Sequence, residues 1–290
     1  MREHTAREFS TQIPKLQLEW SASSYSTLLQ CPRRYQLQTL EGWHSPGDRI
    51  NLDFGSAYHE ALAAYDTALH AGATFDDAVD CAVKIALCFP LPLFDNIRNR
   101  FTLVRSVVWY TEQFHNDPLP TSALDSGPGI EVYFTLDTGI KASTGEEFKF
   151  RGYLDKIVER DGRRAILERK TTGKTLGEAY FNGFSPDNQV TLYSVGGVSL
   201  LEGETVEVII EACQVAVGFS RYERHSVFRK REYLDEFLGE MKYWLAQAEV
   251  FATLNMWPKN ETACRICPFA RVCSKSPHTR KMWLEAEFVQ

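Results

Sequence analysis

Of the 290 residues in the chain, 44% are hydrophobic and 24% are charged. This composition is typical of a folded globular protein and excludes a disordered, collagenous or disulfide-scaffold chain. The formal net charge of −6 provides no overall attraction to nucleic acid, so any nucleic-acid binding must depend on a local basic surface.

Three kinds of signal are missing from the sequence. No apolar run approaches the ~18 residues needed to cross a bilayer, so we expect no membrane partner. The first residues, MREHTAREFSTQ, lack the apolar core of a secretory signal, so we expect an intracellular, cytoplasmic protein. No P-loop of the G-x-x-x-x-G-K-[ST] type occurs, so we expect no helicase motor in this chain.

The first part of the chain has helical patterns, and the middle part has strand patterns. Helices are predicted at 21–40 with an interruption at Pro32, and at 54–69, 76–88 and 97–114. After a Pro/Gly/Ser-rich connection, strands are predicted at 130–136, 148–159, 164–170, 206–217 and 222–228. An inserted helix is expected to begin at Ser185 as the cap with Pro186 in its first turn, and a long helix follows at 233–254.

This order predicts a mixed α/β (α+β) fold in which helices flank a small mixed sheet. We expect an N-terminal tail over residues 1–20, followed by a single domain over 21–290. Within that domain we expect a helical part, a catalytic sheet core, and a C-terminal helix with a cysteine cluster, at 21–116, 130–230 and 231–290.

The most informative pattern is a predicted β-hairpin whose two-residue turn is Asp161-Gly162. In the register that this turn sets, Asp155 and Glu168 lie directly opposite each other. Two facing carboxylates repel each other when both are ionised. A divalent cation would turn that repulsion into a binding site, and oxygen ligands suit Mg²⁺ or Mn²⁺.

Lys170 lies two residues beyond Glu168 and therefore on the same face of its strand. A cation in that position can orient a nucleophilic water or offset charge on a phosphate. The alternative is a solvated outer face on which the acidic pair is incidental.

Three of the seven cysteines, Cys264, Cys267 and Cys273, lie within ten residues of one another. C-x₂-C is the usual spacing for two thiolates on one metal or cluster, and either iron–sulfur or zinc fits soft sulfur ligands. Two other features are less specific. Cys81, Cys88 and Cys213 are expected to be small buried hydrophobes, and Arg33-Arg34 is a basic pair suited to phosphate contacts.

The hairpin resembles a known signature: Asp155 followed by Glu168-Arg169-Lys170 is similar to the D…(D/E)-x-K motif of the PD-(D/E)XK nuclease superfamily. Further segments resemble the RecB-like branch of that superfamily, in the order of the branch. That branch includes the CRISPR-adaptation nucleases and the AddB helicase-nuclease subunits. The matching segments are SASSYSTLLQCPRRY at 21–35, GSAYHEAL at 55–62, QVTLY with Gln189 and Tyr193, and Cys31 with Cys264, Cys267 and Cys273.

The resemblance implies a restriction-endonuclease-like core and assigns roles to individual residues. His59 would join Asp155 and Glu168 as a ligand of Mg²⁺ or Mn²⁺, together with the main-chain carbonyl of Arg169. It further implies that Gln189 and Tyr193 contact DNA, and that Cys31 completes the ligand set of a [4Fe-4S] cluster, with zinc as the rival occupant.

Two hypotheses of function follow. The first is a metal-dependent DNA nuclease, an exonuclease acting on single strands or DNA ends in repair, recombination, phage replication or CRISPR adaptation. The second is a non-catalytic DNA-binding or scaffold module of the same fold, acting with a helicase, integrase or CRISPR-adaptation partner. The intact Asp155, Glu168 and Lys170 favour the first hypothesis.

Overall fold

The computed structural model describes residues 8–46, 49–93, 97–201, 203 and 205–290, which form two compact units. The first unit contains residues 50–134 and 153–234. The second contains the described residues up to 49, together with 135–152 and 235–290. No helix within the described ranges has the length and hydropathy needed to traverse a bilayer.

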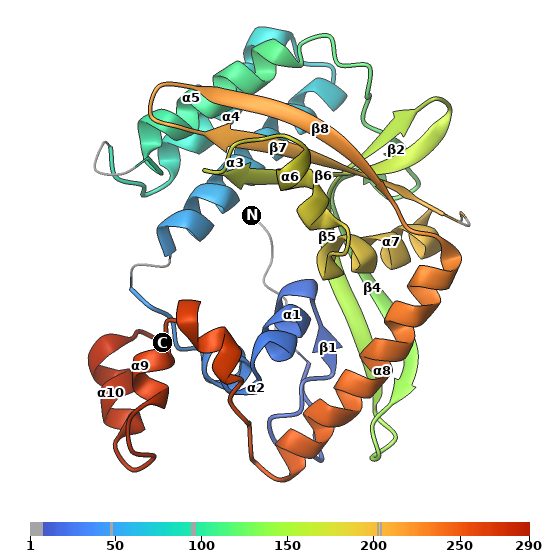
Figure 1. The fold of residues 1–290 in the computed structure, drawn as a ribbon. Helices are drawn as coiled ribbons and strands as arrows, with labels where there is room; N and C mark the ends of the chain where they lie inside the picture. The colour runs from blue at the N-terminus through green and yellow to red at the C-terminus, as the bar shows by residue number, and fades with distance from the viewer. Residues whose placement is uncertain (1–7, 47–48, 94–96, 202, 204) are drawn as a thin grey trace. The chain divides into compact units, whose positions relative to one another are not determined.

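Both units contain helices and strands (Figure 1). In the first unit they are α3 (Arg49–His70), α4 (Phe75–Cys88), α5 (Arg100–Gln113), β2 (Ala123–Leu124), β3 (Gly127–Pro128), β6 (Arg163–Thr172), α6 (Glu178–Phe181), α7 (Asn188–Leu200), β7 (Glu207–Val215) and β8 (Ser220–Phe228). In the second they are β1 (Glu19–Trp20), α1 (Ala22–Gln30), α2 (Pro32–Tyr35), α9 (Ala270–Cys273) and α10 (Arg280–Glu287). The chain passes between the units at the start of α3 and within β4 (Ile130–Lys141), β5 (Glu147–Arg160) and α8 (Arg231–Thr253).

The sheet of the first unit is mixed, as the sequence predicts. Its strand order is β5-β6-β7-β8, and β4 also pairs with β5. Strands β6 and β7 are parallel, whereas the β5–β6 and β7–β8 pairs are antiparallel. The parallel pair needs a crossover connection, and the inserted helix α7 lies in that connection.

The predicted hairpin between β5 and β6 is confirmed in its turn and its register. Asp161 and Gly162 both have positive φ, 51° and 73°, as a two-residue hairpin turn requires. The pairs run from Arg160 with Arg163 to Lys156 with Leu167. The described pairs end there, and Asp155 and Glu168 occupy the next positions of the same register, with their carboxyl groups close together.

Helices cover the sheet of the first unit in two groups. Helices α3, α4 and α5 share one apolar core with Cys213 and Val215 of β7 and with Tyr222 of β8 (Figure 1). Helix α7 packs against β6, where a Cβ atom added to Gly197 would lie 2.7 Å from Ile166 Cδ1. Glycine at this position is therefore what allows the helix to approach the strand so closely.

The second unit includes the end of the segment that was expected to be an N-terminal tail. Leu16, Leu18 and Trp20 are buried, and β1 pairs in parallel with residues 149–150 of β5. The tail therefore does not extend to residue 20. The intervening Gln17 and Glu19 are buried as well, and both have polar partners: Gln17 accepts a hydrogen bond from the Tyr35 hydroxyl at 2.8 Å, and Glu19 pairs with Arg151 at 3.0 Å.

Two smaller predictions are wrong. Helix α7 begins at Asn188 with Asp187 as its cap, because the Asp187 carboxylate accepts a hydrogen bond from Val190 N at 2.9 Å; Ser185 is therefore not the cap. Cys81 and Cys88 are exposed, whereas Cys213 is buried as expected. Both exposed cysteines lie on α4, a helix that packs through small alanines and leaves its other faces to solvent.

Candidate active site

The site is centred on Asp155, which is 2% exposed and lies where β5 separates from β6. The described backbone pairing of the two strands ends at Lys156, and the next contact between them is made by the Asp155 side chain. Its Oδ2 accepts a hydrogen bond from the main-chain N–H of Arg169 at 2.8 Å. Its Oδ1 lies 2.8 Å from His59 Nδ1.

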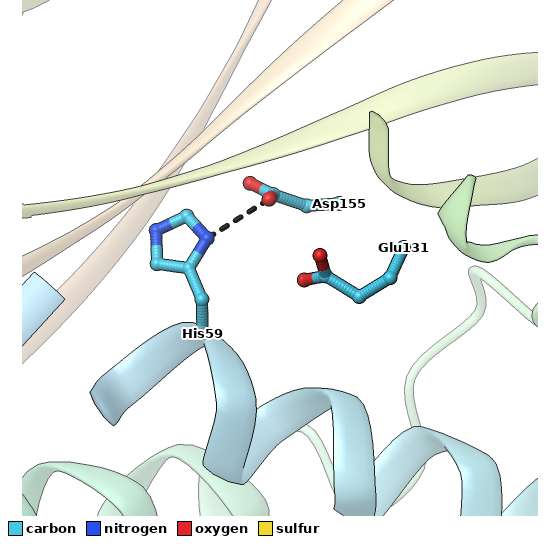
Figure 2. Close-up of side chains that lie close together, drawn as sticks. All are labelled: His59, Glu131 and Asp155. Atoms are coloured by element: carbon cyan, nitrogen blue, oxygen red, sulfur yellow. Dashed lines mark hydrogen bonds and ion pairs between the residues drawn. The ribbon is translucent and has the colours of Figure 1, made fainter. Parts of the chain in front are cut away.

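His59, Glu131 and Asp155 each direct a ligand atom toward a common point (Figure 2). These three atoms lie within 4.8 Å of one another. His59 projects from α3, Glu131 comes from the start of β4, and Asp155 comes from β5. One imidazole and two carboxylates form a donor set that can hold a divalent cation.

Sequence reasoning missed Glu131. Its backbone has a φ of 50°, which is uncommon for a residue other than glycine. Two residues earlier, Gly129 accepts a hydrogen bond from Ile157 N through its carbonyl at 2.7 Å, and a Cβ atom at Gly129 would lie 2.8 Å from Ile157 Cβ. This close approach brings Glu131 beside Asp155. No spacing rule relates these two positions, so the sequence alone gives no signal for Glu131.

Glu168 lies on β6 with its carboxylate close to that of Asp155. Its Oε2 atom is buried and accepts no hydrogen bond from a donor among the described residues. Burial, and then the nearby Asp155 carboxylate, raise the pKa of Glu168 to about 8. Two carboxyl groups that face each other are stabilised by a shared proton or by a cation between them, which fits the predicted metal site.

Lys170 completes a polar cluster with Gln189 and Glu168. Its Nζ donates to Glu168 Oε1 at 2.6 Å and to Gln189 Oε1 at 2.7 Å. Burial alone would lower the pKa of Lys170, but the nearby acidic residues Glu168, Asp155 and Asp187 together raise it. The ammonium group is therefore held in its charged form.

Gln189 and Tyr193 lie on one face of α7, as their spacing predicts. Gln189 Nε2 donates to Glu168 Oε1 and to the Tyr193 hydroxyl, both at 3.0 Å. Tyr193 is 8% exposed and packs edge to face against Phe134. The contacts of this pair are directed at the acidic site, and a DNA contact by either residue stays a prediction.

On the other face of β6, Arg169 lies in a buried ion network. Its guanidinium donates to Asp66 Oδ2 at 2.6 Å and to Glu211 Oε1 at 3.2 Å, and Lys156 donates to Asp66 Oδ1 at 2.8 Å. Although burial alone would raise the pKa of Asp66, Arg169 and Lys156 lower it. Asp66 is seven residues after His59 on α3, so this network fixes the helix that carries the imidazole. A role for the Arg169 carbonyl as a ligand stays a prediction.

The four predicted cluster cysteines meet in the second unit. Cys31, Cys264, Cys267 and Cys273 line one small cavity. Burial raises the thiol pKa of Cys267 and Cys273, so a bound cation is needed to hold them as thiolates. Of the two predicted phosphate-binding arginines, Arg34 lines the same cavity, whereas Arg33 Nε donates to the Trp257 carbonyl at 2.8 Å.

The fold and the first unit's site together have the features of a metal-dependent hydrolase: a mixed sheet, converging carboxylates and imidazole, and an adjacent lysine. The family model of the PD-(D/E)XK nuclease superfamily matches residues 19–274, so the chain belongs to this nuclease superfamily. Enzymes of this superfamily use divalent metals and act on DNA.

Several solved structures are similar to this chain, two of which are described below, and no curated protein matches it. One is from Eubacterium rectale and is provisionally named an exonuclease; it has a TM-score of 0.51 and 11% identity, and the match covers 89% of each chain. The other is SSO0001, with a TM-score of 0.38, 13% identity, and coverage of 89% of this chain and 86% of that chain. At 11% identity, the likeness to the first structure shows the fold alone.

Proposed function

We propose that this nuclease is an exonuclease that degrades single-stranded DNA or DNA from its ends, with His59, Glu131, Asp155 and Glu168 as its metal-binding residues. The observation that carries the proposal is the convergence of His59, Glu131 and Asp155 within 4.8 Å, beside the buried Glu168 carboxylate. The imidazole favours Mn²⁺ over Mg²⁺, since Mg²⁺ prefers oxygen ligands. A bound divalent ion would polarise the scissile phosphate and lower the pKa of a water.

The chain's own residues supply the remaining steps. The Lys170 ammonium donates hydrogen bonds to Glu168 and Gln189, and its side chain is 25% exposed. It can therefore reach a phosphate and offset the negative charge that develops there during cleavage. Gln189 is a positioning residue, because it contacts both Lys170 and Glu168. The edge-to-face contact of Tyr193 with Phe134 holds Gln189 in turn.

Exonuclease action is tested by comparing linear with circular single-stranded DNA of the same sequence in Mn²⁺. We expect the linear strand to be degraded progressively from an end and the circle to resist. Cleavage of both at the same rate would assign an endonuclease instead. Binding without cleavage of either substrate would favour the scaffold function.

We further propose that the cysteine cavity of the second unit holds a [4Fe-4S] cluster. The proposal is supported by the four cysteines that line this one cavity, and by the C-x₂-C-x₅-C spacing of Cys264, Cys267 and Cys273, which with the upstream Cys31 resembles the iron–sulfur variant of the RecB-like branch. In this proposal the cluster has a structural role, tying α2 to the segment around α9.

Iron, sulfide and zinc analysis of anaerobically purified protein separates the two occupants. We expect iron and sulfide in equal amounts with visible absorption in the wild type, and their loss in Cys264→Ser. Cys81→Ser is the matched control, because Cys81 is exposed and does not line the cavity. One zinc per chain with no iron would contradict the cluster.

A further inference from the structure

The second unit contains a groove of about 850 Å³ that borders the cysteine cavity at Cys273 and whose charged side chains have no role in the metal or cysteine sites. It is near the upper end of the range for binding pockets. Four cationic side chains line it, from Lys15, Arg33, Arg280 and Lys281, with Glu41 as the acidic residue among its lining. None of these residues belongs to the candidate active site.

The two arginines of the groove are held by backbone carbonyls. Arg33 Nε donates to the Trp257 carbonyl at 2.8 Å, and Arg280 donates to the carbonyls of Lys275 and Cys273 at 3.2 and 3.3 Å. These bonds use only part of each guanidinium and neutralise none of its charge. The arginines are therefore oriented in advance while keeping donors for a ligand.

The groove also has a surplus of hydrogen-bond donors. Trp257 is 1% exposed and lines the groove, and its indole N–H has no acceptor among the described residues. The Lys15 ammonium is 3.9 Å from Glu41, while Lys281 is 85% exposed and 3.8 Å from Glu285. Ion pairs with such long distances and exposed side chains contribute little to stability, and the lysines can readily exchange the carboxylate for another anion.

From this cationic, donor-rich lining we propose that the groove binds the phosphodiester backbone of a nucleic-acid strand. Phosphate oxygens are acceptors that match oriented guanidinium groups and an unpaired indole N–H. Met256, which is 57% exposed, and the Trp43 ring add apolar surface for a base or sugar. The inference rests on the proposed function, since it assigns to the groove a second contact with the strand that the first unit cleaves.

The test is charge reversal at Lys281, an exposed lysine in an i,i+4 pair. Lys84→Glu is the matched control, because Lys84 is also an exposed helical lysine, 73% exposed and paired with Asp80 four residues away. Both variants change the net charge by the same amount. Binding is measured by fluorescence anisotropy with a labelled oligothymidylate of about 20 nucleotides, in EDTA so that no cleavage occurs.

We expect Lys281→Glu to weaken binding roughly threefold or more and Lys15→Glu/Lys281→Glu roughly tenfold or more, with a shallower salt dependence. Lys84→Glu should bind as the wild type does. In Mn²⁺, the groove variants should raise KM for cleavage and leave kcat unchanged, because no active-site residue is altered. Wild-type affinity and salt dependence in both groove variants would overturn the proposal that the groove binds DNA. An equal loss of affinity in Lys84→Glu would also overturn it. A wild type that binds through the groove but cuts no DNA would overturn the proposed function alone.

Discussion

Asp155 is the residue that contacts both His59 on α3 and the β6 residues of the candidate active site. One of its oxygens contacts His59, the other accepts the Arg169 N–H, and its charge helps to raise the pKa of Glu168. Such a concentration of buried negative charge costs stability unless a cation or a proton compensates it. The chemistry of the site therefore depends on what lies between these carboxylates.

Glu131 is the proposed ligand that the sequence analysis did not identify, and its substitution is the most specific test of the site's composition. Glu131→Gln should weaken Mn²⁺ binding by about tenfold or more, because it replaces a charged oxygen ligand with a neutral one. Isothermal titration calorimetry measures the change. Asp137→Asn is the matched control, since Asp137 is an exposed carboxylate on the same strand. Unchanged Mn²⁺ affinity in Glu131→Gln would exclude Glu131 as a ligand.

The pKa of Glu168 predicts how metal binding depends on pH. With its pKa raised to about 8, Glu168 holds a proton in the metal-free protein below that pH. Binding must then release the proton, so Mn²⁺ affinity should rise by up to about tenfold per pH unit until about pH 8 and then level off. Calorimetry in buffers of different ionisation enthalpy counts the released proton. A similar pH slope in Glu168→Gln would show that another group is responsible.

At the scale of elements, the site depends on how closely α7 packs on β6. Gln189 reaches Glu168 and Lys170 only because Gly197 lets the helix approach Ile166. The opposite face of β6 is fixed by Arg169 and its buried partner Asp66 on α3. The catalytic strand is therefore held from both faces, by a glycine contact on one and by ion pairs on the other.

Gly197→Ala should destabilise the protein by about 1–3 kcal/mol, because the new methyl group overpacks a buried contact. It should also lower the cleavage rate by displacing Gln189. Gly239→Ala is the control, since Gly239 lies within α8 with no atom within 4 Å of an added Cβ. That change should stabilise the protein by about 0.5–1 kcal/mol. Urea unfolding measures both, and equal effects of the two substitutions would contradict the packing argument.

At the scale of the whole chain, local sequence patterns predicted most helices and strands. They did not predict contacts between segments that are distant in the sequence. The Asp161-Gly162 turn was sufficient to predict the β5–β6 register, because a two-residue loop leaves few alternatives. The position of Glu131 was not predictable, since it depends on Gly129 fitting against Ile157. Likewise, β1 pairs with a strand more than 100 residues later in the chain, and a two-residue strand leaves almost no pattern.

The proposed metal-dependent phosphodiester cleavage at Asp155, Glu168 and Lys170 is tested most directly by degradation of end-labelled single-stranded DNA in Mn²⁺, with Lys170→Ala beside the wild type. Lys174→Ala serves as the matched control, because Lys174 is exposed and lies four residues further along the chain. We predict cleavage by the wild type and by Lys174→Ala, its loss in EDTA, and a rate about 10²–10³-fold lower in Lys170→Ala. Cleavage by Lys170→Ala at the wild-type rate, or by the wild type in EDTA, would contradict the account.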